Sequence, residues 1–247
     1  MRIKIKLYAN NNVILPKSYN HIMQGFIYAN LDRDFREYIH EGGFEHNKRK
    51  YKMFTFSKLR GKKEPNIIDG KIIFDRSINF VVSSLNADFI ENLSRNIFKN
   101  RLRIGNNLLK FHSLELYDDD YLDKRIHKDK ILIKLISPIV IYSTDENKHT
   151  VYYSPMDKEF KEQIHNNILN KYKAFYDREM ESNDFNIEPA DTEAKYKSVM
   201  EKYKNFFIKG YYGTFYLEGN PELVKVAYYS GLGSKNSQGF GCFNIIK

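Results

Sequence analysis

The 247-residue chain can form one large domain or two small ones, and its net charge of +9, with a pI near 9.3, favours an anionic partner. It carries 19 Tyr and 18 Phe residues among its lysines and arginines, a mixture that suits phosphates and unstacked bases. An ordinary basic protein can have the same composition, so charge alone does not establish nucleic-acid binding. The single cysteine, Cys242, excludes an internal disulfide and a zinc site built from several thiolates.

The N-terminal residues alternate polar and apolar side chains as a strand does, without the apolar core of a signal peptide. No run approaches the roughly 20 apolar residues of a membrane helix. We therefore expect a soluble, cytoplasmic protein with no membrane partner.

Strand and helix patterns alternate along the first half of the chain. Apolar residues at every second position predict a strand at residues 2–7, and apolar spacings of three and four predict a helix from Pro16 to Leu31 and a short one at 33–40. The basic, glycine-bearing segments 42–50 and 58–70 predict loops. The remaining predicted elements are strands at 53–56, 71–74 and 78–82, a helix at 87–99 and a strand at 108–116.

The second half repeats this alternation after a charged segment, residues 117–130, that predicts a loop and a domain boundary. The predicted elements are a strand at 131–142 interrupted at Ser137-Pro138, a strand at 150–153, a helix at 158–175, a hairpin of 196–208 and 211–217 around Gly210, a helix at 221–230 and a strand at 242–246. The element order predicts an α+β fold of two tandem ferredoxin-like (RRM-like) domains, residues 1–122 and 123–247.

A glycine-rich segment, residues 231–241, lies between the last predicted helix and strand. Its four glycines surround Lys235, Asn236 and Ser237, and glycines let a phosphate approach the backbone closely, so the segment is a candidate anion cradle. The order helix, loop, strand excludes the dinucleotide fingerprint and the P-loop, which need strand, loop, helix. The alternative is a helix cap at Gly231 or Gly233 followed by a flexible turn.

Candidate catalytic residues come from proton-transfer chemistry, because the sequence has no zinc motif, no nucleophile elbow and no cluster of carboxylates. We therefore expect neither a metal nor another cofactor. An RNA 2′-OH can attack the adjacent phosphorus when side chains move protons and stabilise charge. Tyr28, His40 and Lys52 lie at element edges near one basic loop, and His46 is a rival histidine. Each alone could be an ordinary packing, helix-end or surface residue.

Several short segments along the chain form a recognisable set. They are Tyr19-Asn-His21, Gln24-Gly25, Ile27-Tyr28, Tyr38-Ile-His40-Glu41, Lys52-Met-Phe-Thr-Phe-Ser57, Leu135-Ile-Ser-Pro-Ile139, Glu159-Phe160 and Gly231-Leu-Gly-Ser-Lys-Asn-Ser-Gln-Gly-Phe-Gly241. In these segments the sequence resembles the CRISPR-associated endoribonucleases that cut precursor CRISPR RNA within its repeats. The resemblance spans nearly the whole chain, and the glycine-rich loop between helix and strand is its most specific part.

The resemblance implies RNA bound on and between two ferredoxin-like domains, and metal-independent cleavage that leaves a 2′,3′-cyclic phosphate and a 5′-hydroxyl. It implies a catalytic set of Tyr28, His40 and Lys52. The segment between His40 and Lys52 is longer than in the family, so His46 and Lys50 are rivals for the catalytic histidine and lysine. The implied RNA-binding residues of the glycine loop are Gly231, Gly233, Lys235, Asn236, Ser237, Gly239 and Gly241.

The same fold and glycine loop also occur in non-catalytic RNA-binding subunits, so a scaffold protein that holds CRISPR RNA is the alternative function. The expected partner in either case is CRISPR repeat RNA, with an effector complex as a further partner. We expect a monomer or a homodimer.

Overall fold

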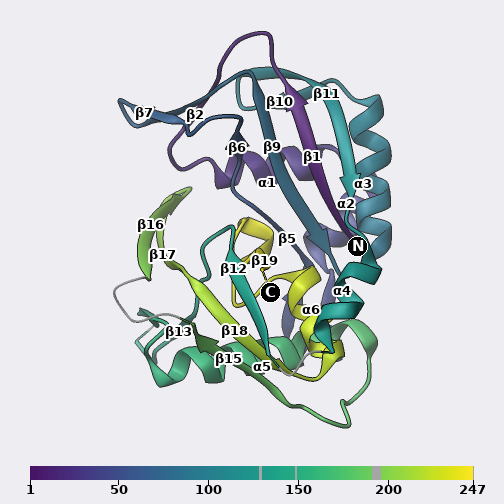
Figure 1. The fold of residues 1–247 in the computed structure, drawn as a ribbon, viewed down its shortest axis with the longest axis vertical. Helices are drawn as coiled ribbons and strands as arrows, with labels where there is room; N and C mark the ends of the chain where they lie inside the picture. The colour runs from purple at the N-terminus through teal and green to yellow at the C-terminus, as the bar shows by residue number, and fades with distance from the viewer. Residues whose placement is uncertain (128–129, 148, 191–195, 247) are drawn as a thin grey trace.

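The computed structural model describes residues 1–127, 130–147, 149–190 and 196–246, and it contains two main antiparallel sheets, one from each half of the chain (Figure 1). The sheet of the first half lies in the upper part of the view, and that of the second half lies in the lower part. Each half has its own buried apolar core. None of the described helices has the length and apolar character needed to cross a membrane.

The first sheet has the strand order of a ferredoxin-like βαββαβ unit. Its central order is β11-β1-β9-β5, with β10 beside β11 and β6 paired to β9. The helices α1, α2 and α3 complete this half. The bounds are β1 (Arg2–Tyr8), α1 (Asn20–Ala29), α2 (Arg33–Glu41), β5 (Phe54–Phe56), β6 (Arg60–Gly61), β9 (Ser77–Ser84), α3 (Ala87–Lys99), β10 (Leu102–Ile104) and β11 (Asn107–Leu116).

The second sheet repeats that strand order as β19-β12-β18-β15, so the α+β fold of two tandem ferredoxin-like domains is confirmed. The helices predicted at 87–99, 158–175 and 221–230 are confirmed as α3, α5 and α6. Asn220 caps α6, because its side chain accepts a hydrogen bond from the Glu222 N–H at 2.9 Å. The bounds are β12 (Ile131–Leu135), α5 (Lys158–Tyr176), β15 (Phe185–Pro189), β18 (Thr214–Gly219), α6 (Pro221–Ser230) and β19 (Phe243–Ile245).

The segment predicted as a loop at 117–130 instead contains helix α4 (Asp119–Ile126); residues 128–129 lie outside the described residues. Asp118 caps this helix by accepting the Asp120 N–H at 2.9 Å. Leu122 and Ile126, four residues apart, are buried in the core of the second half. The proposed limit between residues 122 and 123 falls inside α4, and the exact domain limits stay a prediction.

Short strands replace two of the predicted loops. Residues 42–50 hold most of a hairpin of β3 (Phe44–His46) and β4 (Arg49–Tyr51), whose turn residues Asn47 and Lys48 have positive φ. The Phe44 ring packs against Phe175 of α5, with ring centroids 4.8 Å apart. The loop predicted at 58–70 contains β6 and β7 (Asn66–Ile68), and β7 pairs with β8 (Lys71–Phe74).

Two predicted boundaries are also wrong. Residues 13–16 form strand β2 (Val13–Pro16), so the first helix begins at Asn20 rather than at Pro16. The hairpin near residue 200 consists of β16 (Lys197–Tyr203) and β17 (Phe206–Tyr212), and its turn precedes Gly210. Gly210 lies inside β17, where an added Cβ would come within 3.0 Å of the Ile139 carbonyl oxygen. Close backbone approach, rather than chain reversal, therefore explains this glycine. The hairpin β13 (Tyr142–Thr144) and β14 (Thr150–Tyr152) completes the fold.

The glycine-rich loop, residues 231–241, joins the two halves. Its carbonyl groups accept hydrogen bonds from first-half side chains: Asn20 Nδ2 donates to Gln238 at 2.9 Å, and Thr55 Oγ1 donates to Phe240 at 2.9 Å. An added Cβ at Gly239 would lie 2.5 Å from the Phe56 ring. The loop glycines therefore allow tight packing across the domain interface.

A buried arginine makes a second link between the halves. Arg2 of β1 is fully buried, and its guanidinium lies 4.5 Å from the centroid of the Tyr228 ring of α6. Its Nη2 donates to Asn244 Oδ1 of β19 at 2.6 Å. Both domains therefore contribute to one continuous interface.

We predict that Gly241→Ala destabilises the protein far more than Gly70→Ala. Both glycines have similar positive φ, +74° and +71°, so alanine costs about 1–2 kcal/mol at either site from backbone strain. At Gly241 the added Cβ would also lie 1.9 Å from the Leu232 carbonyl oxygen, whereas at Gly70 nothing lies within 4 Å. Overpacking adds roughly 1–3 kcal/mol at Gly241 alone. Urea unfolding of the two variants measures the difference, and equal losses would contradict the packing role.

Candidate functional site

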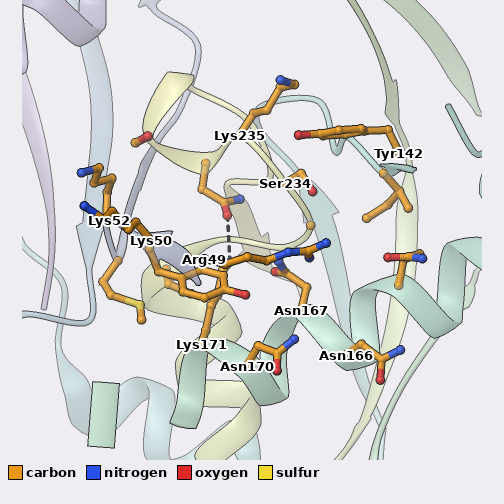
Figure 2. A pocket seen from close by; sticks show the side chains of 18 of the residues that line it. Arg49, Lys50, Lys52, Tyr142, Asn166, Asn167, Asn170, Lys171, Ser234 and Lys235 are labelled. Atoms are coloured by element: carbon orange, nitrogen blue, oxygen red, sulfur yellow. Dashed lines mark hydrogen bonds between the residues drawn. The ribbon is translucent and has the colours of Figure 1, made fainter. Parts of the chain in front are cut away.

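A cavity of about 570 Å³ lies between the two halves of the chain (Figure 2). Its walls come from the β4 end of the β3–β4 hairpin, from β13, from one face of α5 and from the glycine-rich loop. Residues from both domains therefore meet around one space, which neither domain encloses alone.

The charged side chains of the cavity are all basic. They are Arg49, Lys50, Lys52, Lys171 and Lys235, and no described residue of the lining is an Asp or Glu. The Lys235 ammonium also lies 4.8 Å from the centroid of the Tyr142 ring. A cleft lined by charge of one sign concentrates the opposite charge, so this cavity attracts polyanions.

Lys171 of α5 lies buried beneath the glycine-rich loop. Its Nζ donates to the Gly231 carbonyl oxygen at 2.6 Å and to Asn236 Oδ1 at 2.7 Å. Burial lowers the pKa of Lys171 to about 7. A neutral amine has two N–H groups, which match these two acceptors, so the contacts persist when the third proton leaves.

Many polar groups of the predicted anion cradle form hydrogen bonds with other groups of the protein. The N–H groups of Leu232, Ser234 and Gly241 donate to other backbone carbonyls. The amide of Asn236 accepts from Lys171 and donates to the carbonyl oxygens of Leu232 and Phe240, at 2.9 and 3.1 Å, and so holds the loop closed. The loop residues that line the cavity are Gly233, Ser234, Lys235, Asn236 and Ser237. The RNA-binding role of the predicted glycine-loop residues stays a prediction.

Tyr28 of α1 contacts His40 of α2, and Lys52, which lies between β4 and β5, binds the backbone of His40. The Tyr28 and His40 rings meet edge to face with centroids 5.8 Å apart, and both line a second, smaller hollow of about 330 Å³. Lys52 Nζ donates to the His40 carbonyl oxygen at 2.6 Å. Lys52 lines the large cavity, whereas Tyr28 and His40 line the smaller hollow together with Arg36, Glu37 and Glu41.

The surroundings of Tyr28 and Lys52 shift the pKa values of both side chains. Burial raises the pKa of Tyr28 to about 12, so its hydroxyl keeps its proton at neutral pH and can donate a hydrogen bond. Burial, and secondarily the charge of Lys50, lowers the pKa of Lys52. An ammonium group in such surroundings gains stabilisation when an anion binds beside it.

The rival residues occupy different places. His46 lies beside the turn of the β3–β4 hairpin, in register with Arg49, whereas His40 lies in the last turn of α2 next to Tyr28. Lys50 lies closer to the predicted set, because its Nζ donates to the Glu41 carbonyl oxygen at 2.9 Å. Lys50 and Lys52 thus both bind the C-terminal end of α2, where cations are favourable. His40 is therefore the histidine that packs against Tyr28, and both lysines bind the end of its helix; which histidine and which lysine are catalytic stays a prediction.

The sequence interpretation missed several residues of the cavity. They are Arg49, Tyr142, Gln163, Asn166, Asn167, Asn170 and Lys171. The α5 amides were detectable, because positions 163, 166, 167 and 170 follow the spacing of one helix face. Arg49 and Tyr142 gave no comparable signal, because their placement depends on how two hairpins fold against α5.

Two family models match the chain. The model described as CRISPR-associated protein Cas6, N-terminal, matches residues 14–114, and that described as CRISPR associated protein Cas6, C-terminal, matches residues 121–245. CRISPR-associated endoribonuclease Cas6 1 of Methanocaldococcus jannaschii is 29% identical over 246 residues, which cover 98% of this chain and 91% of the relative.

Solved structures give the same result for the fold. One described as CRISPR associated protein Cas6 is 26% identical with a TM-score of 0.79, covering 100% of this chain and 99% of that one. Another, described as an RAMP protein binding different RNA substrates, is 21% identical with a TM-score of 0.80 and full coverage of both chains, which shows a shared fold.

The fold and the cavity define a tandem ferredoxin-like protein that presents a cationic cavity between its domains. Because one of the two family models covers more than half of the sequence, the chain belongs to the CRISPR-associated Cas6 family.

We predict that Lys171 makes the protein more stable as the pH rises from about 7 toward the ordinary lysine pKa of about 10.4. In that window the unfolded chain binds a proton that the folded protein has released, so the free energy of unfolding rises by at most about 1.4 kcal/mol per pH unit. Lys171→Met removes this contribution and lowers stability overall, because two carbonyl oxygens lose their donor.

The measurement is urea unfolding of the wild type and of Lys171→Met at several pH values. The difference between their unfolding free energies should increase with pH above 7. A constant difference would mean that Lys171 stays protonated in the folded protein.

Proposed function

We propose that this Cas6 protein is an endoribonuclease that cleaves precursor CRISPR RNA within its repeats, by attack of an RNA 2′-OH on the adjacent phosphorus. The attack would leave a 2′,3′-cyclic phosphate and a 5′-hydroxyl, without a metal ion. The relatives named as endoribonucleases support the RNA substrate and the reaction class. The observation that carries the proposal is the contact of the Tyr28 and His40 rings in the small hollow, together with the hydrogen bond to the His40 backbone from Lys52, a cation of the large cavity.

In this mechanism, His40 transfers protons. As a base it takes the proton of the 2′-OH, and in protonated form it can give a proton to the departing 5′ oxygen. His40 is exposed in the last turn of α2, so substrate can reach its ring.

Lys52 and Tyr28 stabilise and orient the reacting phosphate. Lys52 lines the large cavity and binds the His40 backbone, so its ammonium group would stabilise the negative charge that develops on a phosphate bound beside it as the phosphorane forms. The Tyr28 hydroxyl, whose pKa burial raises to about 12, serves as a hydrogen-bond donor that orients the phosphate or carries a second proton. The rest of the RNA then follows the basic cavity toward Lys235.

We predict that His40→Ala lowers the cleavage rate by roughly 10²–10⁴-fold, because it removes the proton carrier. Lys52→Ala should lower the rate roughly 10²–10³-fold by removing charge stabilisation, and Tyr28→Phe should have a smaller effect. Single-turnover cleavage of the cognate repeat RNA in excess EDTA measures each rate, and the same RNA with a 2′-deoxy nucleotide at the cut position should stay intact.

His46→Ala and Lys50→Ala are the matched variants, one for each rival position. His46→Ala should cleave as the wild type does, since its histidine lies beside the hairpin turn. Loss of cleavage in His46→Ala with retention in His40→Ala would reverse the assignment. Tight RNA binding without cleavage by the wild-type protein would favour the non-catalytic scaffold function.

We predict that Lys235→Ala weakens RNA binding and makes it less salt-dependent. Removal of one phosphate contact should reduce the slope of log K against log salt by about 0.7 for single-stranded RNA. Lys158→Ala is the control, because Lys158 is an exposed lysine of α5 that does not line the cavity. Affinity titrations at several salt concentrations provide the slopes, and identical slopes for wild type and Lys235→Ala would remove Lys235 from the RNA path.

A further inference from the structure

The β16–β17 hairpin belongs to the second half of the chain but contacts helix α1 of the first half. Figure 1 shows it extending from the second half toward the first. The Tyr203 hydroxyl of β16 donates a hydrogen bond to Gln24 Oε1, and the Tyr203 and His21 rings meet edge to face with centroids 6.4 Å apart. The Lys202 N–H also donates to Ser18 Oγ at 3.3 Å. The hairpin is therefore a further contact between the domains, in addition to the glycine-rich loop.

Gln24 extends this contact to the glycine-rich loop. Its Nε2 donates to the Ser237 carbonyl oxygen at 2.8 Å, while its Oε1 accepts from Tyr203. The hairpin and the loop therefore each bind one end of the same amide. Ser237 lines the large cavity, whereas Tyr203 is not among the described residues of its lining. One side chain of α1 thus links the Tyr203 hydroxyl to a wall of the cavity.

A second chain of hydrogen bonds runs beside the first. Lys58 Nζ donates to Glu201 Oε1 of β16 and to Asn20 Oδ1, both at 2.7 Å. Asn20 Nδ2 donates in turn to the Gln238 carbonyl oxygen at 2.9 Å. The Lys58 and Glu201 side chains are only 17% and 16% exposed, so solvent screens their ion pair little. Because Asn20 and Gln24 lie four residues apart on one face of α1, the two chains reach neighbouring residues of the loop.

The part of the loop that receives these contacts has an unfavourable backbone conformation at Lys235. This residue has a left-handed φ of +61° and directly precedes the 3₁₀ turn Asn236–Gln238. A left-handed conformation is unfavourable for a residue with a Cβ and persists where the surrounding structure holds it. The Ser237 and Gln238 carbonyl groups, which the two chains bind, lie within three residues of Lys235. The hairpin therefore contributes to holding this conformation.

We propose that Tyr203 and Glu201 are positioning residues for RNA binding. Through Gln24 and Asn20 they hold the turn that follows Lys235, and they thereby keep the Lys235 side chain at the cavity wall. This inference rests on the proposed function, because it takes RNA as the ligand of the cavity. It also assigns a role to residues of α1 that the proposed catalytic set does not use.

The first test removes one hydroxyl group. Tyr203→Phe should weaken binding of the cognate repeat RNA roughly three- to tenfold, the size expected for the loss of one hydrogen bond. The cleavage rate at saturating RNA should stay near that of the wild type, because Tyr28 and His40 keep their contact. Tyr196→Phe is the matched control, since the Tyr196 hydroxyl donates to the Thr214 carbonyl oxygen at 3.0 Å within the second domain. Fluorescence anisotropy and single-turnover cleavage provide the two readouts.

The second test determines whether Tyr203 acts through Lys235. The RNA affinities of the wild type, Tyr203→Phe, Lys235→Ala and the double variant form a double-mutant cycle. Once the Lys235 side chain is removed, Tyr203→Phe should weaken binding by less than about twofold. A hydrogen bond that is merely structural would cause the same fold loss in both backgrounds. Thermal unfolding of every variant confirms that the fold is intact.

Glu201 provides a second pair of variants. Glu201→Leu removes an acceptor of Lys58 and should weaken RNA binding, whereas Glu201→Gln retains an acceptor oxygen and should restore most of the affinity. Hydrogen–deuterium exchange of residues 232–241, measured without RNA, should be faster in Tyr203→Phe and Glu201→Leu than in the wild type. Exchange in Tyr196→Phe should not change. This measurement tests the positioning of the loop separately from any ligand.

Three results would overturn the inference. They are RNA binding by Tyr203→Phe as tight as that of the wild type, an equal fold loss of affinity with and without the Lys235 side chain, and unchanged exchange of the loop in Tyr203→Phe. Cleavage distinguishes this inference from the proposed function. If the wild type binds the repeat RNA but never cleaves it, the endoribonuclease proposal alone fails; if the wild type cleaves and Tyr203→Phe loses no affinity, the positioning role alone fails.

Discussion

The structure depends on the packing of the glycine-rich loop between the two domains. Gly239 has no room for a Cβ beside the Phe56 ring, and Asn20 and Thr55 of the first domain donate to the loop's carbonyl oxygens. Lys171 binds the loop from the second domain. If the domains moved apart, these hydrogen bonds and the packing of the loop against Phe56 would be lost together. The cavity lies beside this contact, because the loop forms one of its walls.

The cavity brings several positive charges close together, and their mutual repulsion must be limited. Several cations converge there without a carboxylate among the described lining residues, and one of them, Lys171, is fully buried. Burial lowers the pKa of Lys171 to about 7, so near neutral pH its charge is partly absent and repels the other cations less. Lys235 and Lys52 line the cavity, so their positive charges are available to bind a polyanion.

The sequence was sufficient for elements with strong local signals and insufficient for those that depend on tertiary contacts. Helices α3, α5 and α6 have clear apolar periodicity, and α6 also has Asn220 and Pro221 at its start. The β3–β4 hairpin was missed because its stability comes from packing of Phe44 on Phe175, 131 residues away (175 − 44). Helix α4 was hidden by its charged surface, and only Leu122 and Ile126 indicated a buried face. Among the site residues, Tyr28, His40 and Lys52 were selected for their chemistry and their position at element edges, and the resemblance then implied them as a set. Arg49 and Tyr142 required the folded hairpins.

The hydrogen bond from Lys52 to the His40 backbone has one more consequence. An ammonium group has three N–H bonds, and the carbonyl oxygen of His40 occupies one of them. Two remain, so an RNA phosphate bound to Lys52 would not displace the protein contact. The Lys52 Nζ atom would then bind both the end of α2 and the phosphate. It would fix the distance between them even if the exposed hairpin turn changed its conformation.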